Sequence, residues 1–251
     1  MSRPDLYRRL TQLTPARLRL EAGAGPARLT DLLDFQQDHA AARDAIHGQV
    51  DWDALARDLS PLPVLHVASR ATDRATYLRR PDLGRQLATA DLPRLEPPLL
   101  VVIGDGLSAP AVMAQAAPLM AALSARLPEL QDQPVVLARG ARVALGDAVG
   151  WAMGAAMVLM LIGERPGLSV ADSLGAYLTL APRIGLRDNA RNCVSNIHGR
   201  GGLSHAAAAD RLTWLIREAR RIGVTGVALK DDSGGGLPGG AQAAPVAGKP
   251  A

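Results

Sequence analysis

Residues 160–200 read MLIGERPGLSVADSLGAYLTLAPRIGLRDNARNCVSNIHGR, and this stretch is the most informative part of the chain. It begins inside an apolar run, residues 156–162, which has the composition of a strand buried on both faces. The run ends at Gly163, and the charged pair Glu164 and Arg165 follows directly. In open α/β sheets, ligands bind just beyond the carboxyl ends of the strands. The pattern therefore predicts a ligand crevice that begins at Gly163.

Apolar runs and amphipathic stretches alternate on both sides of this segment. Such alternation is typical of βαβ units, in which helices cover a parallel sheet. We therefore predict an α/β fold with a Rossmann-like, mostly parallel sheet flanked by helices. The expected strands are 99–103, 156–162 and 174–180, and a further strand is expected to begin at 134–137. The expected helices are 108–127, 145–153 and 205–221.

The N-terminal third has a different character. Residues 30–47 have a helical apolar stripe that includes Leu32, Leu33 and Phe35, whereas prolines recur between residues 61 and 98. The end of the chain is rich in glycine, proline and alanine without periodicity, which is typical of disorder. We therefore predict an N-terminal helical arm and irregular lobe at 1–97, a Rossmann-like domain at 98–232 and a disordered tail at 233–251.

The composition excludes several classes of protein. Although the net charge is +4, the arginines are scattered and only 3% of the residues are aromatic, so nucleic-acid binding is not expected. The longest apolar run, residues 151–162, is too short to cross a membrane. Cys193 is the single cysteine, which excludes an internal disulfide and a multi-cysteine metal site. With no secretory apolar region near residue 1, we expect a cytoplasmic protein.

The residues alone leave several local alternatives open. The turn at Gly104-Asp105-Gly106 is not a G-x-G-x-x-G motif, which argues against nicotinamide binding, and it either contacts a ligand or forms a tight turn with Ser108 as helix N-cap. Glu164 on its own is more typical of a solvated ion-pair loop. Cys193 is either a small apolar residue or a nucleophile. Val143, taken alone, is consistent with ordinary core packing.

Several motifs appear together and in order between residues 14 and 232. They include Gly163–Ser169 (GERPGLS), Asp172–Tyr177 (DSLGAY) and Arg191–His198 (RNCVSNIH), with TPAR, LLDFQ, IGDGLS and GVALKD elsewhere in the chain. This ordered set resembles the small-subunit family of ethanolamine ammonia-lyase. The chain departs from the family pattern at Glu21 and at Gly104, where the family usually has glycine and alanine.

The resemblance implies a function and a binding site. It implies one subunit of an adenosylcobalamin-dependent ammonia-lyase that converts ethanolamine to acetaldehyde and ammonia by a radical mechanism. It also implies that Val143, Glu164 and Cys193 contact the cobalamin. A carboxylate such as that of Glu164 would accept strong hydrogen bonds from amide N–H groups on the corrin rim.

The same resemblance places the remaining chemistry on a partner. In this family a separate large subunit holds the substrate, cobalamin lies between the two subunits, and six copies of each assemble, often inside a bacterial microcompartment. We therefore expect no catalytic side chain on this chain. The histidines show no zinc-type spacing, and no D-x-H-x-x-G motif is present, so no protein metal ligand is expected and cobalt should keep its dimethylbenzimidazole ligand. The alternative is a non-catalytic Rossmann-like scaffold that only stabilises a partner.

Overall fold

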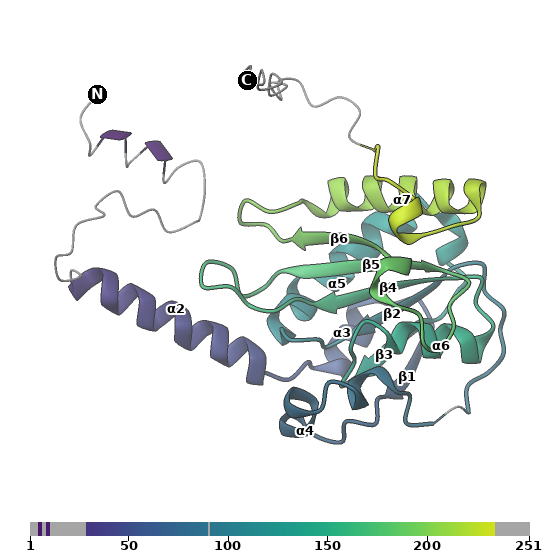
Figure 1. Cartoon of the computed structure of the whole chain (residues 1–251), viewed down its shortest axis with the longest axis horizontal. Helices are drawn as coiled ribbons and strands as arrows, with labels where there is room; N and C mark the ends of the chain where they lie inside the picture. Colours follow the sequence, from purple (N-terminus) through teal and green to yellow (C-terminus); the bar gives the residue numbers. More distant parts are fainter. Residues whose placement is uncertain (1–4, 7–8, 11–28, 90, 234–251) are drawn as a thin grey trace, which may run out of the picture.

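The protein is described by a computed structural model in which one sheet carries helices on both faces (Figure 1). The described residues are 5–6, 9–10, 29–89 and 91–233. Apart from Ser233, the tail predicted at 233–251 lies outside them, as do the TPAR segment and Glu21. Within the described part of the chain, no helix is long and apolar enough to span a membrane.

The predicted elements are found close to their expected positions, together with others that the sequence did not indicate. The strands are β1 Val64–Ala68, β2 Leu100–Gly104, β3 Val135–Arg139, β4 Met157–Gly163, β5 Leu174–Leu180 and β6 Asn192–Ile197. The helices are α2 Leu29–His47, α3 Trp52–Asp58, α4 Arg74–Arg79, α5 Ala109–Ser124, α6 Leu145–Met153 and α7 His205–Ile222. Every helix and strand predicted from the sequence is therefore present, with ends shifted by three residues or fewer.

The α/β class is confirmed, but the sheet is mixed rather than mostly parallel in its pairing. Its strand order is β1-β3-β2-β4-β5-β6; the first three pairings are parallel and the last two are antiparallel. The cause lies in the connection 164–173 between β4 and β5. It contains no helix, and it is shorter than the dozen or more residues that a parallel crossover needs. The prediction that 174–180 continues a parallel βαβ series was therefore wrong.

The sequence pattern predicted neither of the two outer strands of the sheet. β1 is only partly buried and contains His66, and β6 is rich in polar residues, so neither is a continuous apolar run. β1 nevertheless pairs with β3 along its whole length, and Trp52 and Leu55 of α3 are buried in the main core. The region before residue 98 thus contributes a strand and a helix to the same sheet and core as the region after it.

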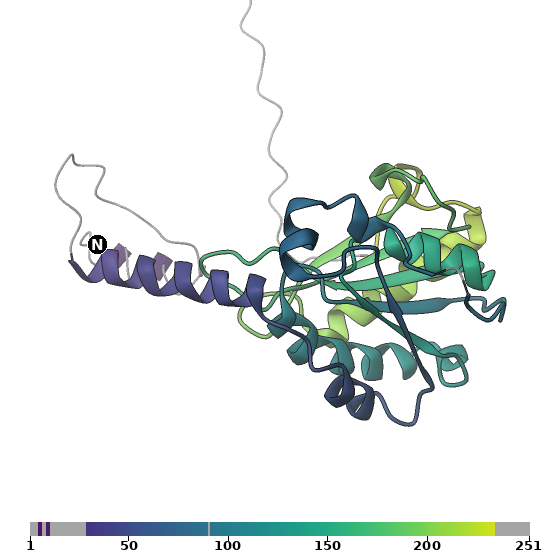
Figure 2. The same ribbon diagram turned by 90° about the horizontal axis from the view of Figure 1, so that it is seen from below.

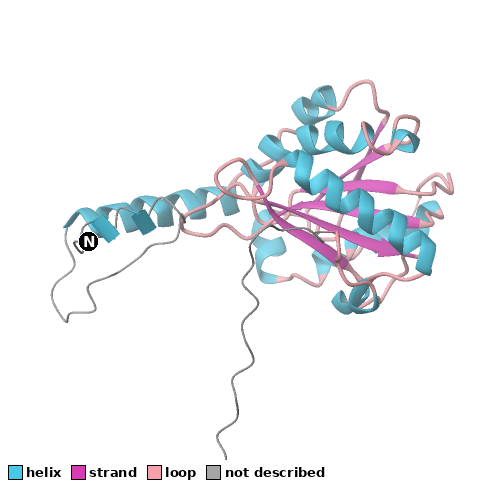
Figure 3. Ribbon diagram, turned by 90° about the horizontal axis from the view of Figure 1, so that it is seen from above, coloured by secondary structure: helices cyan, strands magenta, loops and turns pink. Residues whose placement is uncertain are grey.

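Alternate side chains of the central strands point to opposite faces, so the sheet separates two apolar clusters. Val101 and Ile103 of β2 belong to the cluster covered by α3, α5 and α7, whereas Leu100 and Val102 belong to the one covered by α6. Figure 3 shows helices on both sides of the sheet. The predicted helix at 30–47 is confirmed as α2, which projects from the body as an arm (Figure 2). Among its residues, only Ala45 is buried.

A buried ion pair joins α6 to the start of β6. The guanidinium of Arg191 contacts the carboxylate of Asp147, and these side chains are only 2% and 3% exposed. The other terminal nitrogen of Arg191 donates to Asp188 at 2.8 Å. Burial raises the pKa of Asp147, and the hydrogen bond and charge of Arg191 oppose that rise. Because each charge has lost its water, each depends on the other for its stability in the core.

Breaking this pair should destabilise the fold strongly. Arg191→Met leaves the Asp147 carboxylate buried without its cation, and we expect a loss of about 3–5 kcal/mol in the free energy of unfolding. Asp188→Ala is the matched control, because its side chain is 92% exposed and the loss should stay below about 1 kcal/mol. Urea unfolding of both variants measures the difference. Equal losses would show that the buried pair is not a major stabilising contact.

Candidate functional site

A pocket of about 420 Å³ lies beyond the carboxyl ends of β2 and β4, where the sequence predicted a ligand crevice. Val143 and Glu164 both line it, although twenty residues and a strand separate them in the chain. Its walls combine apolar side chains with two tyrosines and two arginines. The lining residues are Tyr77, Gly106, Leu107, Arg142, Val143, Ile162, Gly163, Glu164, Arg165 and Tyr177.

The floor of the pocket forms where two loops approach each other closely. Gly106 follows β2 with φ +57°, a left-handed conformation that favours glycine. A Cβ atom at this position would lie 2.2 Å from the carbonyl oxygen of Gly163. The N–H of Leu107 donates to that same oxygen at 2.9 Å. Glycine at both positions therefore lets the ends of β2 and β4 pack backbone against backbone, which brings Leu107 next to Glu164.

Glu164 is half-buried, and two donors fix one of its carboxylate oxygens. Ser173 Oγ donates to Oε2 at 2.5 Å, and the backbone N–H of Asn196 donates to the same oxygen at 3.2 Å. The Glu164 backbone N–H also donates to the Ser173 carbonyl at 3.0 Å. No residue that the structure describes donates a hydrogen bond to Oε1. One carboxylate oxygen is thus held in place, and the other can accept from a ligand.

Cys193 does not line the pocket, but it contacts a residue that does. It is opposite Tyr177 in the antiparallel pairing of β5 with β6. Cys193 is exposed, whereas Tyr177 forms part of the pocket wall. Desolvation raises the pKa of the Cys193 thiol; the Tyr177 hydroxyl lowers it, and the charge of Glu164 raises it further. The structure therefore brings Val143 and Glu164 together and places Cys193 at the margin.

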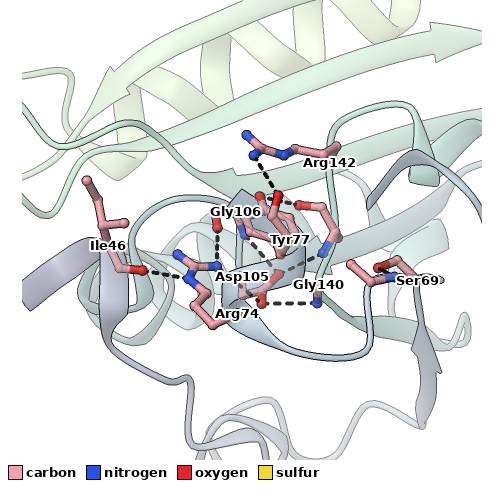
Figure 4. A network of polar contacts seen from close by, with 10 residues as sticks. Ile46, Ser69, Arg74, Tyr77, Asp105, Gly106, Gly140 and Arg142 are labelled. Atoms are coloured by element: carbon pink, nitrogen blue, oxygen red, sulfur yellow. Dashed lines mark hydrogen bonds and ion pairs between the residues drawn. The ribbon is translucent and has the colours of Figure 1, made fainter. Parts of the chain in front are cut away.

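Tyr77 forms one wall of the pocket, and the guanidinium groups of two arginines lie against its ring (Figure 4). It is only 1% exposed, and its hydroxyl donates to the carbonyl of Ala141 at 3.0 Å. The guanidinium carbon of Arg142 lies 4.1 Å from the ring centroid, and that of Arg74 lies 4.7 Å from it. Burial raises the pKa of the Tyr77 hydroxyl, so this side chain is neutral at physiological pH. Cation–π contacts on this ring orient both arginines.

Asp105 fastens the loops after β2 and β3 to each other. Its carboxylate accepts the backbone N–H groups of Gly106 at 3.0 Å, Gly140 at 3.0 Å and Ala141 at 2.8 Å (Figure 4). Burial raises the pKa of Asp105, while the donors at Ala141 and Gly140 and the charge of Arg74 lower it. A side chain of the protein itself therefore holds the loops after β2 and β3 together.

The turn at Gly104-Asp105-Gly106 was expected either to contact a ligand or to form a tight turn with Ser108 as helix N-cap, and the structure has features of both. Ser108 Oγ accepts the N–H of Ala111 at 3.1 Å, so it is the N-cap of α5 as the tight-turn alternative required. The carboxylate of Asp105 is occupied by backbone donors, whereas Gly106 lines the pocket. The turn thus shapes the pocket, and Asp105 supports it from behind.

Three pocket residues were missed from the sequence: Tyr77, Arg142 and Tyr177. Tyr177 ends the DSLGAY motif, so the resemblance offered a signal for it. Arg142 adjoins Val143 and offered a weaker one. Tyr77 comes from α4, far from the other residues in the chain, and begins the segment YLRRPDLG, which also resembles the family. Within the described residues, no cluster of three His, Cys, Asp or Glu side chains can hold a metal ion.

Comparison with known proteins gives one consistent result. Residues 4–230 match the family model described as ethanolamine ammonia-lyase light chain. A protein of Rhodopseudomonas palustris (strain BisA53) named ethanolamine ammonia-lyase small subunit is 53% identical over 236 residues, which cover 90% of each chain. A protein with the same name from Bradyrhizobium diazoefficiens is 51% identical, and the match covers 93% of this chain and 95% of the relative. Another from Azotobacter vinelandii is 45% identical, and the match covers 90% of this chain and 88% of the relative.

The close approach beneath the pocket can be tested with a single methyl group. Gly106→Ala should destabilise the fold by about 2–5 kcal/mol, because a left-handed Cβ costs about 1–2 kcal/mol and overpacking adds about 1–3 kcal/mol. Gly223→Ala is the matched control, since φ there is +74° and the added Cβ meets nothing within 4 Å. Thermal unfolding compares the two variants. Similar losses would mean that the loops separate easily and that their contact does not fix the pocket.

Proposed function

The chain belongs to the ethanolamine ammonia-lyase light-chain family, and on this premise we propose that its pocket binds one part of adenosylcobalamin at the interface with a large catalytic subunit. The chain is the small subunit of an ammonia-lyase complex. The observation that carries the cofactor proposal is the shared pocket of Val143 and Glu164. The family resemblance implies that both residues contact cobalamin.

The residues present suit one edge of a corrinoid. Leu107, Val143 and Ile162 supply apolar contact, and the free Oε1 of Glu164 supplies a hydrogen-bond acceptor. Pockets that enclose drug-sized ligands occupy about 300–1,000 Å³, and a corrinoid is larger than such ligands. At about 420 Å³, this pocket can hold only part of it. The proposal therefore requires a second protein surface to cover the remainder, as a subunit interface would.

Each proposed contact has a distinct role. The corrin rim carries amide side chains whose N–H groups are donors, and a carboxylate forms short, charge-assisted hydrogen bonds with them. Ser173 and Asn196 hold Glu164 in position, so little side-chain freedom would be lost on binding. Tyr177 contributes a wall, and Cys193 lies opposite it in the pairing of β5 with β6. We therefore place Cys193 at the edge of the cobalamin contact.

The chemistry of the reaction would come from the cofactor and the partner. Bound adenosylcobalamin supplies the radical chemistry that converts ethanolamine to acetaldehyde and ammonia. This chain would orient the cofactor and exclude water from the face that it covers. We infer that the substrate is held by the large subunit, and we assign no catalytic side chain here. Assembly as six copies of each subunit, in the cytoplasm or a bacterial microcompartment, stays a prediction from the resemblance.

The alternative is a scaffold that stabilises its partner without touching the cofactor. Two observations favour the cofactor proposal: Glu164 lines the pocket, and its Oε1 accepts no hydrogen bond from a described residue. Scaffold contacts alone would not require a carboxylate with one oxygen fixed and one available.

Retention of cobalamin should require both subunits. The reconstituted complex with hydroxocobalamin should keep the cobalamin absorption spectrum through gel filtration, because the ligand would be enclosed from two sides. Either subunit alone should lose most of the colour, and this chain alone should produce no acetaldehyde from ethanolamine with adenosylcobalamin. Full retention by the large subunit alone would favour the scaffold alternative, and turnover by this chain alone would contradict the proposal.

Glu164→Ala should weaken cobalamin binding without unfolding the chain. A hydrogen bond to a charged acceptor contributes about 1.5–3 kcal/mol, so the dissociation constant should rise roughly ten- to a hundredfold. Glu164→Gln should lose nearly as much, because the Asn196 N–H requires the amide oxygen and the NH₂ group would then replace Oε1. Cofactor titration of the reconstituted complex measures both effects.

Ser173→Ala is the control for this experiment. It removes a donor to Oε2 but leaves Oε1 free, so its effect should stay below about tenfold. The Michaelis constant for ethanolamine at saturating cofactor should not change in any of these variants. If Glu164→Ala binds cobalamin as tightly as the unmodified chain, Glu164 is not a cofactor contact.

A further inference from the structure

Arg142 is fixed in place but forms no ion pair with any residue that the structure describes. Its backbone N–H donates to the Gly84 carbonyl at 2.8 Å, and its Nη2 donates to the Tyr77 carbonyl at 3.2 Å. Its guanidinium also stacks on the Tyr77 ring. Its Nε is buried without a hydrogen-bond partner among the described residues, and none of the ion pairs between them includes Arg142. A half-buried, oriented cation is therefore left without an ion-pair partner among the described residues.

Arg74 provides an internal comparison, because it stacks on the same ring. Its Nη1 lies 3.8 Å from a carboxylate oxygen of Asp105 and donates to the carbonyl of Gly106 at 2.8 Å (Figure 4). Its Nε donates to the carbonyl of Ile46 at 2.6 Å. Arg74 lines a separate pocket of about 400 Å³, which Asp105 also lines. Although Arg74 Nη2 is also buried without a hydrogen-bond partner, Arg74 has a carboxylate beside it, whereas Arg142 forms no ion pair among the described residues.

The surroundings of Arg142 favour an oxyanion. Arg142 and Arg165 line the pocket with only one carboxylate, that of Glu164, so the charged side chains of the wall sum to a net positive charge. Helix α6 follows directly after Ala144 and has no side-chain cap, so its positive end adds to the same field. A guanidinium of fixed orientation matches the geometry of phosphate oxygens.

We propose that Arg142 binds the phosphodiester of the cobalamin nucleotide loop, an inference that rests on the proposed function. The side chains of the corrin rim are neutral amides, and the phosphodiester is the anionic group of cobalamin. Glu164 and Arg142 would therefore recognise different parts of one ligand from the same pocket. Glu164 would accept from the amides, and Arg142 would donate to the phosphate.

The test compares three ligands that differ in the nucleotide loop. Cobalamin carries the phosphodiester and the base, cobinamide phosphate carries a phosphate without the base, and cobinamide carries neither. Their dissociation constants are measured by absorbance titration of the complex reconstituted from both subunits. Unmodified complex must bind cobalamin for the proposed function to stand, so failure at this step is separate from failure of the Arg142 assignment.

Arg142→Gln should weaken cobalamin and cobinamide phosphate about tenfold or more and cobinamide less than twofold. Arg142→Lys should lie between, because it keeps the charge but loses the planar fork. Arg74→Gln is the matched control: it removes the other cation from the Tyr77 ring, and any effect should be equal for the three ligands. Thermal unfolding of each variant reports damage to the fold, which would also weaken all ligands equally.

Selective loss for the two phosphate-bearing ligands supports the assignment. Equal losses for all three ligands, or no loss for any, would overturn it and leave Arg142 as a support for Tyr77 or a contact of the large subunit. Loss for cobalamin alone would overturn it as well, because Arg142 would then recognise the base rather than the phosphate.

Discussion

The carboxylate of Asp105 is the contact on which the pocket depends, because it joins loops that no strand pairing would hold together. By accepting the N–H groups of Gly140 and Ala141, it fixes the loop that carries Arg142 and Val143. The turn that begins with Asp105 also places Gly106 against Gly163, the residue before Glu164. Val143 and Glu164 therefore line one pocket because the half-buried carboxylate of Asp105 holds the neighbouring loops in place through backbone hydrogen bonds.

The sequence predicts those parts of the fold whose signal is local. Continuous apolar runs mark β2 and β4 because both faces of each strand are buried, and helical periodicity marks α7. Edge strands lack that signal, so β1 and β6 were missed. The direction of β5 depends on the length of the connection before it rather than on its own residues, which is why alternation alone predicted the wrong pairing.

The candidate site is predicted only in part for a related reason. Val143 and Glu164 came from the family resemblance, and the structure adds what the resemblance could not give. The orientation of Glu164 depends on Ser173 and Asn196, and the pocket wall depends on Tyr77 from another helix. These contacts join residues far apart in sequence, and they follow from the packing of the sheet and not from any local pattern.

The structure of the complex of both subunits with bound cobalamin tests the cofactor proposal most directly. We predict that the corrin lies between the subunits with its edge against Val143, and that an amide nitrogen of its rim lies about 2.7–3.2 Å from Glu164 Oε1. A complex in which the large subunit encloses cobalamin completely, with protein side chains filling the pocket of Val143 and Glu164, would contradict it.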